Sequence, residues 1–168
     1  MPKFQTTGRR RIVMVTAYDA PNARAAEAAG VDWLLVGDSA AMVVHGMDST
    51  RGATHAMMRL HTQAVRRGSA KLPVVTDLPY ASVRRPKTEL LRDARALIAA
   101  GADAVKIEWT PRAEAQTEAL VRAGVPVMGH VGLTPQDLKP GAAFKLRGND
   151  PRAAQKILSQ AVAFERLG

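Results

Sequence analysis

The sequence predicts an α/β fold in which helices cover a parallel sheet. Five short apolar runs alternate with longer stretches rich in alanine, leucine and arginine, which is the pattern of repeated β–α units. Three of the longer stretches end in a glycine that leads into the next apolar run, at Gly30, Gly101 and Gly124. Glycine just past a helix end is the common left-handed cap. These patterns leave open whether the sheet is open or closes into a barrel.

The elements can be assigned in order from their composition. The strands are short and rich in β-branched or other apolar residues, and we expect them at 12–16, 33–36, 74–76, 104–107 and 125–128. The helices fall between and after them, and we expect them at 22–29, 55–67, 86–100, 113–123 and 151–167. No linker or low-complexity segment interrupts the series, so we expect residues 1–168 to form a single domain.

Composition and charge exclude several classes of protein. With 46% hydrophobic and 23% charged residues the chain is expected to be globular rather than disordered. The absence of cysteine excludes a disulfide framework, a zinc–thiolate site and a cysteine nucleophile. No apolar run is long enough for a signal-peptide core or a membrane span, so we expect a cytoplasmic protein without a membrane partner. The net charge of +9 makes a basic nucleic-acid binder a third alternative, but aromatic residues make up only 4%, and we expect no nucleic-acid partner.

Each expected strand is followed by a titratable side chain. In chain order these are Asp19, Asp38, Asp77, Glu108 and His130. In parallel α/β folds the ligand site lies at the carboxyl ends of the strands, in barrels and open sheets alike. The pattern therefore predicts a functional site at this edge.

Alternation along the fourth strand indicates which side chains enter that site. Lys106 and Glu108 share one face, whereas Val105 and Ile107 share the other. If the two apolar residues pack beneath the helices, Lys106 and Glu108 point into the site, although a buried Lys–Glu pair without function is the alternative. Carboxylates that meet at one rim repel one another. A hard cation such as Mg²⁺, which prefers oxygen ligands, would resolve that repulsion.

Competing motifs are weaker. The segment 37–41 begins like the G-x-S-x-G elbow of serine hydrolases, but Ala41 stands where the last glycine belongs. No P-loop, G-x-G-x-x-G or H-E-x-x-H motif occurs. His55 and His61 are six residues apart, which does not place them on one helical face, so we expect no zinc pair there. We expect His45 and His55 to be ordinary loop or helix-surface residues.

Six motifs in register together resemble the ketopantoate hydroxymethyltransferase family. They are VMVTAYD at 13–19, LVGDS at 35–39, MVV, Gly46 and DST within 42–50, VVTDLP at 74–79, GADAVKIE at 101–108 and PVMGHVGLTPQ at 126–136. Each motif alone is modest, but the series runs in order over nearly the whole chain. The stretches Arg51–Ala53 and Arg84–Arg85 depart from the family pattern because they carry more charge.

The resemblance implies a fold and a reaction. The fold is a (β/α)₈ barrel of the phosphoenolpyruvate-binding group, of which this chain would supply the N-terminal portion of about five βα units. Full-length members assemble as homodecamers. The reaction transfers a hydroxymethyl group from 5,10-methylenetetrahydrofolate to 3-methyl-2-oxobutanoate and gives 2-dehydropantoate, in pantothenate biosynthesis.

The resemblance also implies roles for individual residues. The Mg²⁺ positions are Asp38, Asp77 and Glu108. The contacts to the 2-oxo acid are Asp38, Ser39, Asp77 and Lys106. The catalytic positions within this chain are Lys106 and His130.

The family's general base is a glutamate at the end of the sixth strand, which falls beyond Gly168. We therefore expect the 168-residue chain to bind Mg²⁺ and the oxo acid weakly and to turn over negligibly. The alternative is a catalytically inactive α/β remnant that acts only by association with other chains.

Overall fold

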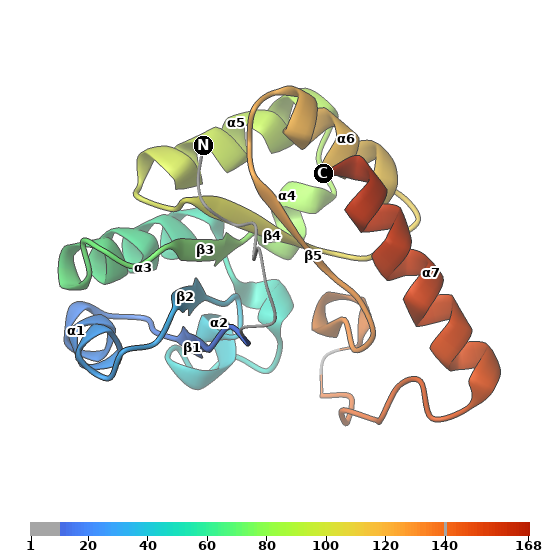
Figure 1. Ribbon diagram of the computed structural model, residues 1–168, viewed down its shortest axis with the longest axis horizontal. Coiled ribbons are helices and arrows are strands. Elements are labelled where there is room, and N and C mark those ends of the chain that lie inside the picture. The colour runs from blue at the N-terminus through green and yellow to red at the C-terminus, as the bar shows by residue number, and fades with distance from the viewer. Residues whose placement is uncertain (1–10, 140) are drawn as a thin grey trace.

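The five strands of the protein follow one another across a single parallel sheet. The computed structural model describes residues 11–139 and 141–168, and its sheet has the order β1-β2-β3-β4-β5 (Figure 1). The strands are β1 (Met14–Thr16), β2 (Trp33–Val36), β3 (Val74–Asp77), β4 (Ala104–Glu108) and β5 (Val127–His130). A doubly wound sheet would reverse its order at a switch point, whereas this sheet advances in one direction, as barrel strands do. The strand order therefore indicates barrel-type winding rather than an open, doubly wound sheet.

The longer helices form one layer against the sheet. They are α1 (Ala20–Ala28), α3 (His55–Gly68), α5 (Lys87–Ala99), α6 (Ala113–Arg122) and α7 (Pro151–Leu167). Each of these helices packs against the next one along the chain, and α7 also contacts β5 (Figure 1). Short helical turns occupy the loops after the strand ends: α2 (Ala40–Val43), η1 (Thr50–Gly52), α4 (Tyr80–Val83) and η2 (Pro135–Asp137). These short turns, which the sequence pattern did not predict, surround the carboxyl edge of the sheet.

Local sequence signals explain where the helices begin and end. Asp19 caps α1 by accepting the N–H of Asn22 at 2.8 Å, and Asp150 caps α7 in the same way. The three predicted glycine caps are confirmed, because Gly30, Gly101 and Gly124 have φ of +77°, +112° and +75°.

The fifth strand lies two residues later than expected. The N–H of Val125 bonds to the carbonyl oxygen of Leu120 at 3.0 Å, so Val125 still closes the end of α6. Pairing with β4 begins only at Val127. The apolar run at 125–128 therefore combines a helix-closing residue with the start of a strand, and alternation alone does not separate the two.

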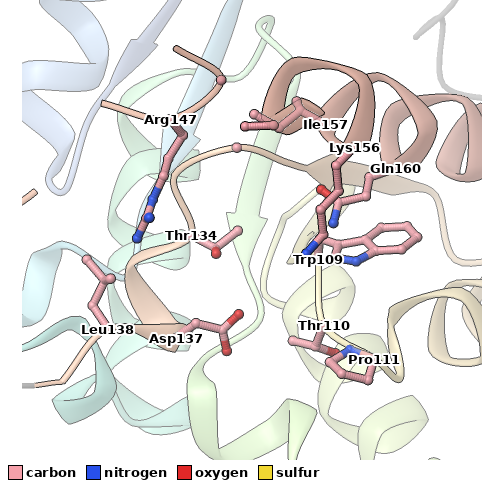
Figure 2. Close-up of a pocket in the computed structure, with 13 residues that line it drawn as sticks. Trp109, Thr110, Pro111, Thr134, Asp137, Leu138, Arg147, Lys156, Ile157 and Gln160 are labelled. Atoms are coloured by element: carbon pink, nitrogen blue, oxygen red, sulfur yellow. The ribbon is translucent and has the colours of Figure 1, made fainter. Parts of the chain in front are cut away.

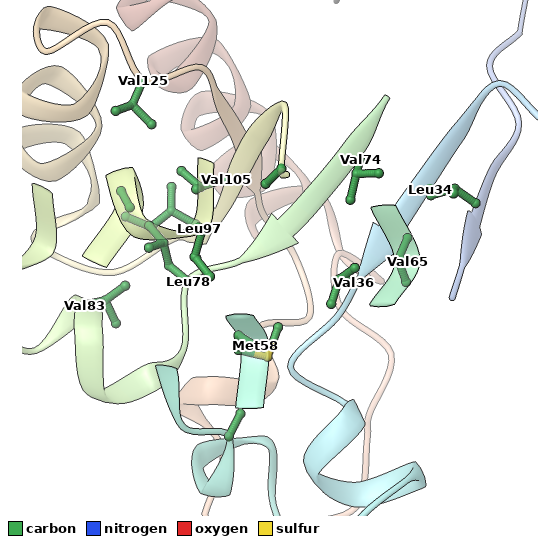
Figure 3. Close-up of a cluster of buried hydrophobic side chains, with 14 of the residues drawn as sticks. Leu34, Val36, Met58, Val65, Val74, Leu78, Val83, Leu97, Val105 and Val125 are labelled. Carbon is green, nitrogen blue, oxygen red and sulfur yellow. The ribbon is translucent and has the colours of Figure 1, made fainter. Parts of the chain in front are cut away.

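The hydrophobic core lies between the sheet and the helix layer (Figure 3). Leu34 and Val36 of β2 and Val74 of β3 are fully buried there. In β4 the predicted alternation is seen, because Val105 and Ile107 both belong to this core. Lys106 and Glu108 are left on the other face, where they meet Asp77 and His130 of the neighbouring strands.

The two edge strands are more exposed than the inner ones. All four residues of β3 are buried, whereas Val13 and Val15 at β1 expose 54% and 37% of their surface. In the described part of the chain no helix is long and apolar enough to cross a membrane.

Candidate active site

Strand register brings the predicted acids and bases together at the carboxyl edge of the sheet. Asp77 is the register partner of Lys106, and Glu108 is the register partner of His130. Lys106 Nζ lies 2.9 Å from Asp77 Oδ1, and His130 Nδ1 lies 3.3 Å from Glu108 Oε1. Lys106 Nζ is also 3.4 Å from His130 Nδ1. The two pairs therefore form one connected cluster.

Asp38 joins this cluster from the end of β2. Its backbone N–H donates to Asp77 Oδ2 at 3.0 Å. A Cβ at Gly37 would lie 3.0 Å from Ser39 Oγ, so glycine at this position leaves room for the Ser39 hydroxyl. Asp38, Asp77 and Glu108 are each only 4% exposed.

The charges of the cluster act on one another. Burial, and then repulsion by Asp77, raises the pKa of Asp38 to about 7, against the opposing influence of Gln136 and Lys106. Burial alone would lower the pKa of Lys106, but the carboxylates around it, Asp77 foremost, outweigh burial and raise that pKa. The lysine is therefore held as a cation within a surplus of carboxyl groups.

Gln136 ties the carboxylates together from η2. Its Nε2 donates to Asp38 Oδ2 at 2.8 Å and to the carbonyl oxygen of Leu78 at 2.9 Å, while its backbone N–H donates to Glu108 Oε2 at 3.0 Å. Gln136 is not among the site residues predicted from the sequence, although it belongs to the glycine-containing segment after the fifth strand. Its function depends on how that loop folds back, which no local pattern reveals.

The two basic stretches that depart from the family pattern brace this loop. Arg51 Nε donates to the carbonyl oxygen of Gln136 at 2.7 Å. Arg84 lies 4.0 Å from Asp137, and the guanidinium groups of both arginines lie over the ring of Tyr80, at 4.7 and 4.8 Å. Arg51 and Arg84 therefore hold the η2 loop in place beside the site.

Ser39 is oriented by Tyr18. The hydroxyls of Tyr18 and Ser39 are 2.7 Å apart, which links the end of β1 to the start of α2. Burial raises the pKa of Tyr18, and its hydrogen bond to Ser39 opposes this. The Tyr18 side chain therefore keeps its hydroxyl proton near neutral pH.

The donor chemistry of the cluster fits a hard divalent cation. The buried Gln136 Oε1 accepts no hydrogen bond, and Asp77 Oδ1 has the Lys106 ammonium as its partner. Carboxylate and amide oxygens are the ligands that Mg²⁺ prefers. Across residues 11–139 and 141–168, no group of three or more His, Asp or Glu side chains is already spaced around one metal position.

A cavity of about 460 Å³ lies between the loops that follow β4 and β5 and the start of α7 (Figure 2). Its wall includes Trp109, which directly follows Glu108, and Thr134 in the loop after β5. Figure 2 shows Arg147 on one side of the cavity and Lys156 of α7 on the same side as Trp109. The cavity therefore combines an indole ring with two cationic side chains.

The chain matches a protein-family model over its whole length. The model, described as ketopantoate hydroxymethyltransferase, matches residues 1–168. Similar curated proteins carry the name 3-methyl-2-oxobutanoate hydroxymethyltransferase. One from Thermus thermophilus is 48% identical over 165 residues, which cover 98% of this chain and 63% of the relative. One from Legionella pneumophila is 42% identical over 167 residues, which cover 99% and 64%. The chain thus spans less than two thirds of the length of these relatives.

Solved structures agree on the fold. A phosphonopyruvate hydrolase in complex with oxalate and Mg²⁺ has a TM-score of 0.70 at 15% identity, covering 95% of this chain and 56% of that one. A 2,3-dimethylmalate lyase, described as a member of the PEP mutase/isocitrate lyase superfamily, has a TM-score of 0.64 at 20% identity, covering 94% and 56%. At such identities the likeness shows the fold alone, and the predicted barrel-type α/β fold is confirmed.

Proposed function

The chain belongs to the ketopantoate hydroxymethyltransferase family, and on this premise we propose that it carries the metal- and oxo-acid-binding part of such an enzyme. The enzyme would transfer a hydroxymethyl group from 5,10-methylenetetrahydrofolate to 3-methyl-2-oxobutanoate and give 2-dehydropantoate. The observation that carries this proposal is the cluster in which Lys106 and His130 pair with Asp77 and Glu108 beside Asp38. None of the comparisons favours the alternative of a non-catalytic remnant.

Asp38, Asp77 and Glu108 would hold Mg²⁺. When bound, the cation supplies positive charge that lowers the cost of negative charge developing on the keto oxygen of a 2-oxo acid. The similar phosphonopyruvate hydrolase, solved with oxalate and Mg²⁺, supports a small oxygen-rich anion as ligand. The buried Gln136 Oε1, which accepts no hydrogen bond, supports a cation in the same place.

Lys106, Ser39 and His130 would act on the oxo acid. Lys106, kept charged by the carboxylates around it, would pair with the carboxylate or the keto oxygen of the acid. Ser39, whose hydroxyl is held by Tyr18, would donate to the carboxylate. His130 lies within 3.4 Å of Lys106 and 3.3 Å of Glu108, so it would line the substrate pocket at the end of β5. We assign removal of the C3 proton to none of these residues.

The cavity beside Trp109 suits the one-carbon donor. A folate has a flat heteroaromatic ring and glutamate carboxylates, and Trp109 offers a stacking surface while Arg147 and Lys156 offer cations. Trp109 follows the proposed ligand Glu108, so a donor bound in this cavity would approach the oxo acid from the side of β4 and β5.

The remaining features rest on the family resemblance. We propose that residues 1–168 form one continuous part of the barrel, that the protein assembles as a homo-oligomer, a decamer in full-length relatives, and that it works in the cytoplasm.

Calorimetric titration of the 168-residue chain with 3-methyl-2-oxobutanoate tests the central proposal. We expect heat of binding in the presence of Mg²⁺ and none in the presence of a chelator. Binding that is equally strong without Mg²⁺, or that is absent in both conditions, would contradict the assignment. Asp103, at the opposite edge of the sheet, provides the matched control, since Asp103→Asn should leave Mg²⁺-dependent binding in place.

A further inference from the structure

His61 of α3 contacts the turn that leads from β1 into α1. Its Nδ1 lies 2.8 Å from the backbone carbonyl oxygen of Tyr18, and the two rings meet edge to face with centroids 5.9 Å apart. The N–H of Ala17 bonds to the carbonyl oxygen of Leu35 in β2 at 3.0 Å, and α1 begins at Ala20. Tyr18 therefore stands between the strand and the helix, where a side chain from α3 holds its carbonyl oxygen.

Chemistry assigns the hydrogen-bond donors around His61. A backbone carbonyl oxygen can only accept, so Nδ1 of His61 carries the proton that it donates to Tyr18. In the neutral ring the lone pair of Nε2 then faces His45, whose Nε2 lies 2.9 Å away and donates to it. His45 stands in the exposed turn after α2. Both ring nitrogens of His61 are thus used, which fixes the tautomer and the orientation of the ring.

Helix α3 gives His61 a fixed frame. The next residue, Thr62, is fully buried, and its hydroxyl lies 2.9 Å from the hydroxyl of Thr76 in β3. Thr76 directly precedes Asp77, one of the proposed Mg²⁺ ligands. The helix that carries His61 is therefore tied to the strand that carries Asp77, while His61 itself holds the end of β1.

The other end of Tyr18 reaches the proposed oxo-acid pocket. Its hydroxyl lies 2.7 Å from Ser39 Oγ, and a Cβ at Gly37 would lie 3.6 Å from the same hydroxyl and 3.7 Å from Asp77 Oδ2. A bound carboxylate can only accept hydrogen bonds, so a serine that binds it donates to it and accepts from Tyr18. Burial raises the pKa of the Tyr18 hydroxyl, which keeps its proton available for this bond.

We propose that His61 is a positioning residue for the oxo-acid site, because it fixes the carbonyl oxygen of Tyr18 and thereby the hydroxyl that orients Ser39 toward the substrate carboxylate. The inference rests on the proposed function of Ser39. In the described part of the chain the polar contacts of His61 go to Tyr18 and His45. The effect of His61 on Ser39 therefore passes through Tyr18.

Calorimetric titration of the 168-residue chain with 3-methyl-2-oxobutanoate in the presence of Mg²⁺ tests this role. His61→Phe keeps a ring in α3 but removes the donor, and it should weaken binding about 10-fold, as is typical of residues that orient a ligand. His61→Asn retains an N–H close to the position of Nδ1 and should restore most of the affinity. His55→Gln is the matched control, since His55 lies in the same helix and its ring contacts the carbonyl oxygen of Asp93 at 3.0 Å. It should bind the oxo acid like the unmodified chain.

A double-mutant cycle separates positioning from a general loss of structure. If His61 acts through Ser39, His61→Phe should cause no further loss of affinity in a Ser39→Ala background, because the hydroxyl that it positions is already absent. A change that merely loosens the fold would weaken binding by the same factor in both backgrounds. That result, or normal binding by His61→Phe in the unmodified background, would overturn the proposal.

A spectroscopic measurement does not depend on oxo-acid binding. The ¹³C resonance of Tyr18 Cζ reports the hydrogen bond of the hydroxyl, and the sequence holds only one other tyrosine, Tyr80. Ser39→Ala should shift the Tyr18 resonance in the unmodified chain and shift it much less in His61→Phe. Equal shifts in both backgrounds would show that His61 does not position Tyr18 toward Ser39. If the unmodified chain binds no oxo acid, the proposed function fails, while unequal shifts would still support the link from His61 to Ser39.

Discussion

Charged side chains pair one to one at the amino edge of the sheet, where the strands begin, but not at its carboxyl edge, where the strands end. At the amino edge, Asp103 Oδ2 accepts the N–H of Val74 at 2.8 Å and pairs with Arg66. Arg66 also donates to the carbonyl oxygens of Gly101 and Leu72, at 2.9 and 3.0 Å. Here one cation meets one carboxylate, and the remaining donors bond the turns that lead into β3 and β4.

At the carboxyl edge the charges do not balance. Three buried carboxyl groups surround one lysine, and burial among them raises the pKa of Asp38 to about 7. The side-chain oxygen of Gln136 is left without a hydrogen bond. The contrast indicates that the amino edge stabilises the fold, whereas the carboxyl edge gives up stability for the capacity to bind a ligand.

Asp77→Asn, at the carboxyl edge, should produce the largest change in ligand affinity. It removes one charge from the proposed ligands and leaves the shape unchanged, so the Mg²⁺-dependent affinity for the oxo acid should fall by at least about 100-fold. That loss exceeds the ~10–100-fold typical of a residue that only orients a ligand. Relief of the repulsion on Asp38 partly offsets the loss of the Lys106 ion pair, so urea unfolding should show a smaller loss than binding does. A variant that binds normally would remove Asp77 from the site.

Arg66→Ala should lower stability without weakening ligand binding. It removes the ion pair of Asp103 and the donor to three backbone carbonyl oxygens, those of Gly101, Ser69 and Leu72. The side chains are only partly buried, so we expect a loss of about 2 kcal/mol in the free energy of unfolding. Mg²⁺-dependent binding should not change. Arg122→Ala is the control, since the Arg122–Glu118 pair is exposed and its loss should cost below about 0.5 kcal/mol in urea unfolding. Equal losses in the two variants would contradict the role assigned to the amino edge.

Gln136→Leu tests whether Gln136 positions the carboxylates for metal binding or only stabilises the fold. It removes the donor to Asp38 Oδ2, and we expect about 10-fold weaker Mg²⁺ binding by calorimetry. Gln116 offers a matched comparison, because it is also buried, donates to the carbonyl oxygen of Val83 at 2.7 Å and leaves its Oε1 without a partner. Gln116→Leu should lower stability without changing Mg²⁺ affinity. If both variants change that affinity alike, Gln136 has only a structural role.

The sequence was sufficient for the parts of the site that lie on regular strands. Alternation in β4 identified the faces of Lys106 and Glu108, and the rule that strands end at the ligand edge identified Asp38, Asp77 and His130. The structure places these side chains together because strand geometry repeats every two residues and parallel strands end together. Their roles in binding and catalysis stay predictions.

The loops around the site could not be predicted in the same way. Gln136 reaches Asp38 across 98 residues, and Arg51 reaches Gln136 across 85. Such contacts depend on how η1 and η2 pack against each other, and no local periodicity encodes that packing. The His45–His61 pair escaped detection for the same reason, since it joins a turn to a separate helix.

The smallest effect concerns the pH dependence of stability without metal. The carboxyl of Asp38 has a pKa of about 7 in the folded chain and an ordinary value of 3.8 when unfolded. The folded state therefore binds the proton of the Asp38 carboxyl more tightly than the unfolded state does. The resulting stabilisation is fully present below the unfolded pKa, declines as pH rises toward 7 and is lost above it. Between pH 6 and 8 we expect a decline of about 1 kcal/mol in the free energy of unfolding, measured in urea with a chelator present. Asp38→Asn cannot ionise and should flatten that decline, whereas Asp103→Asn at the amino edge should preserve it. A decline that persists in Asp38→Asn would show that another group at the carboxyl edge holds the proton.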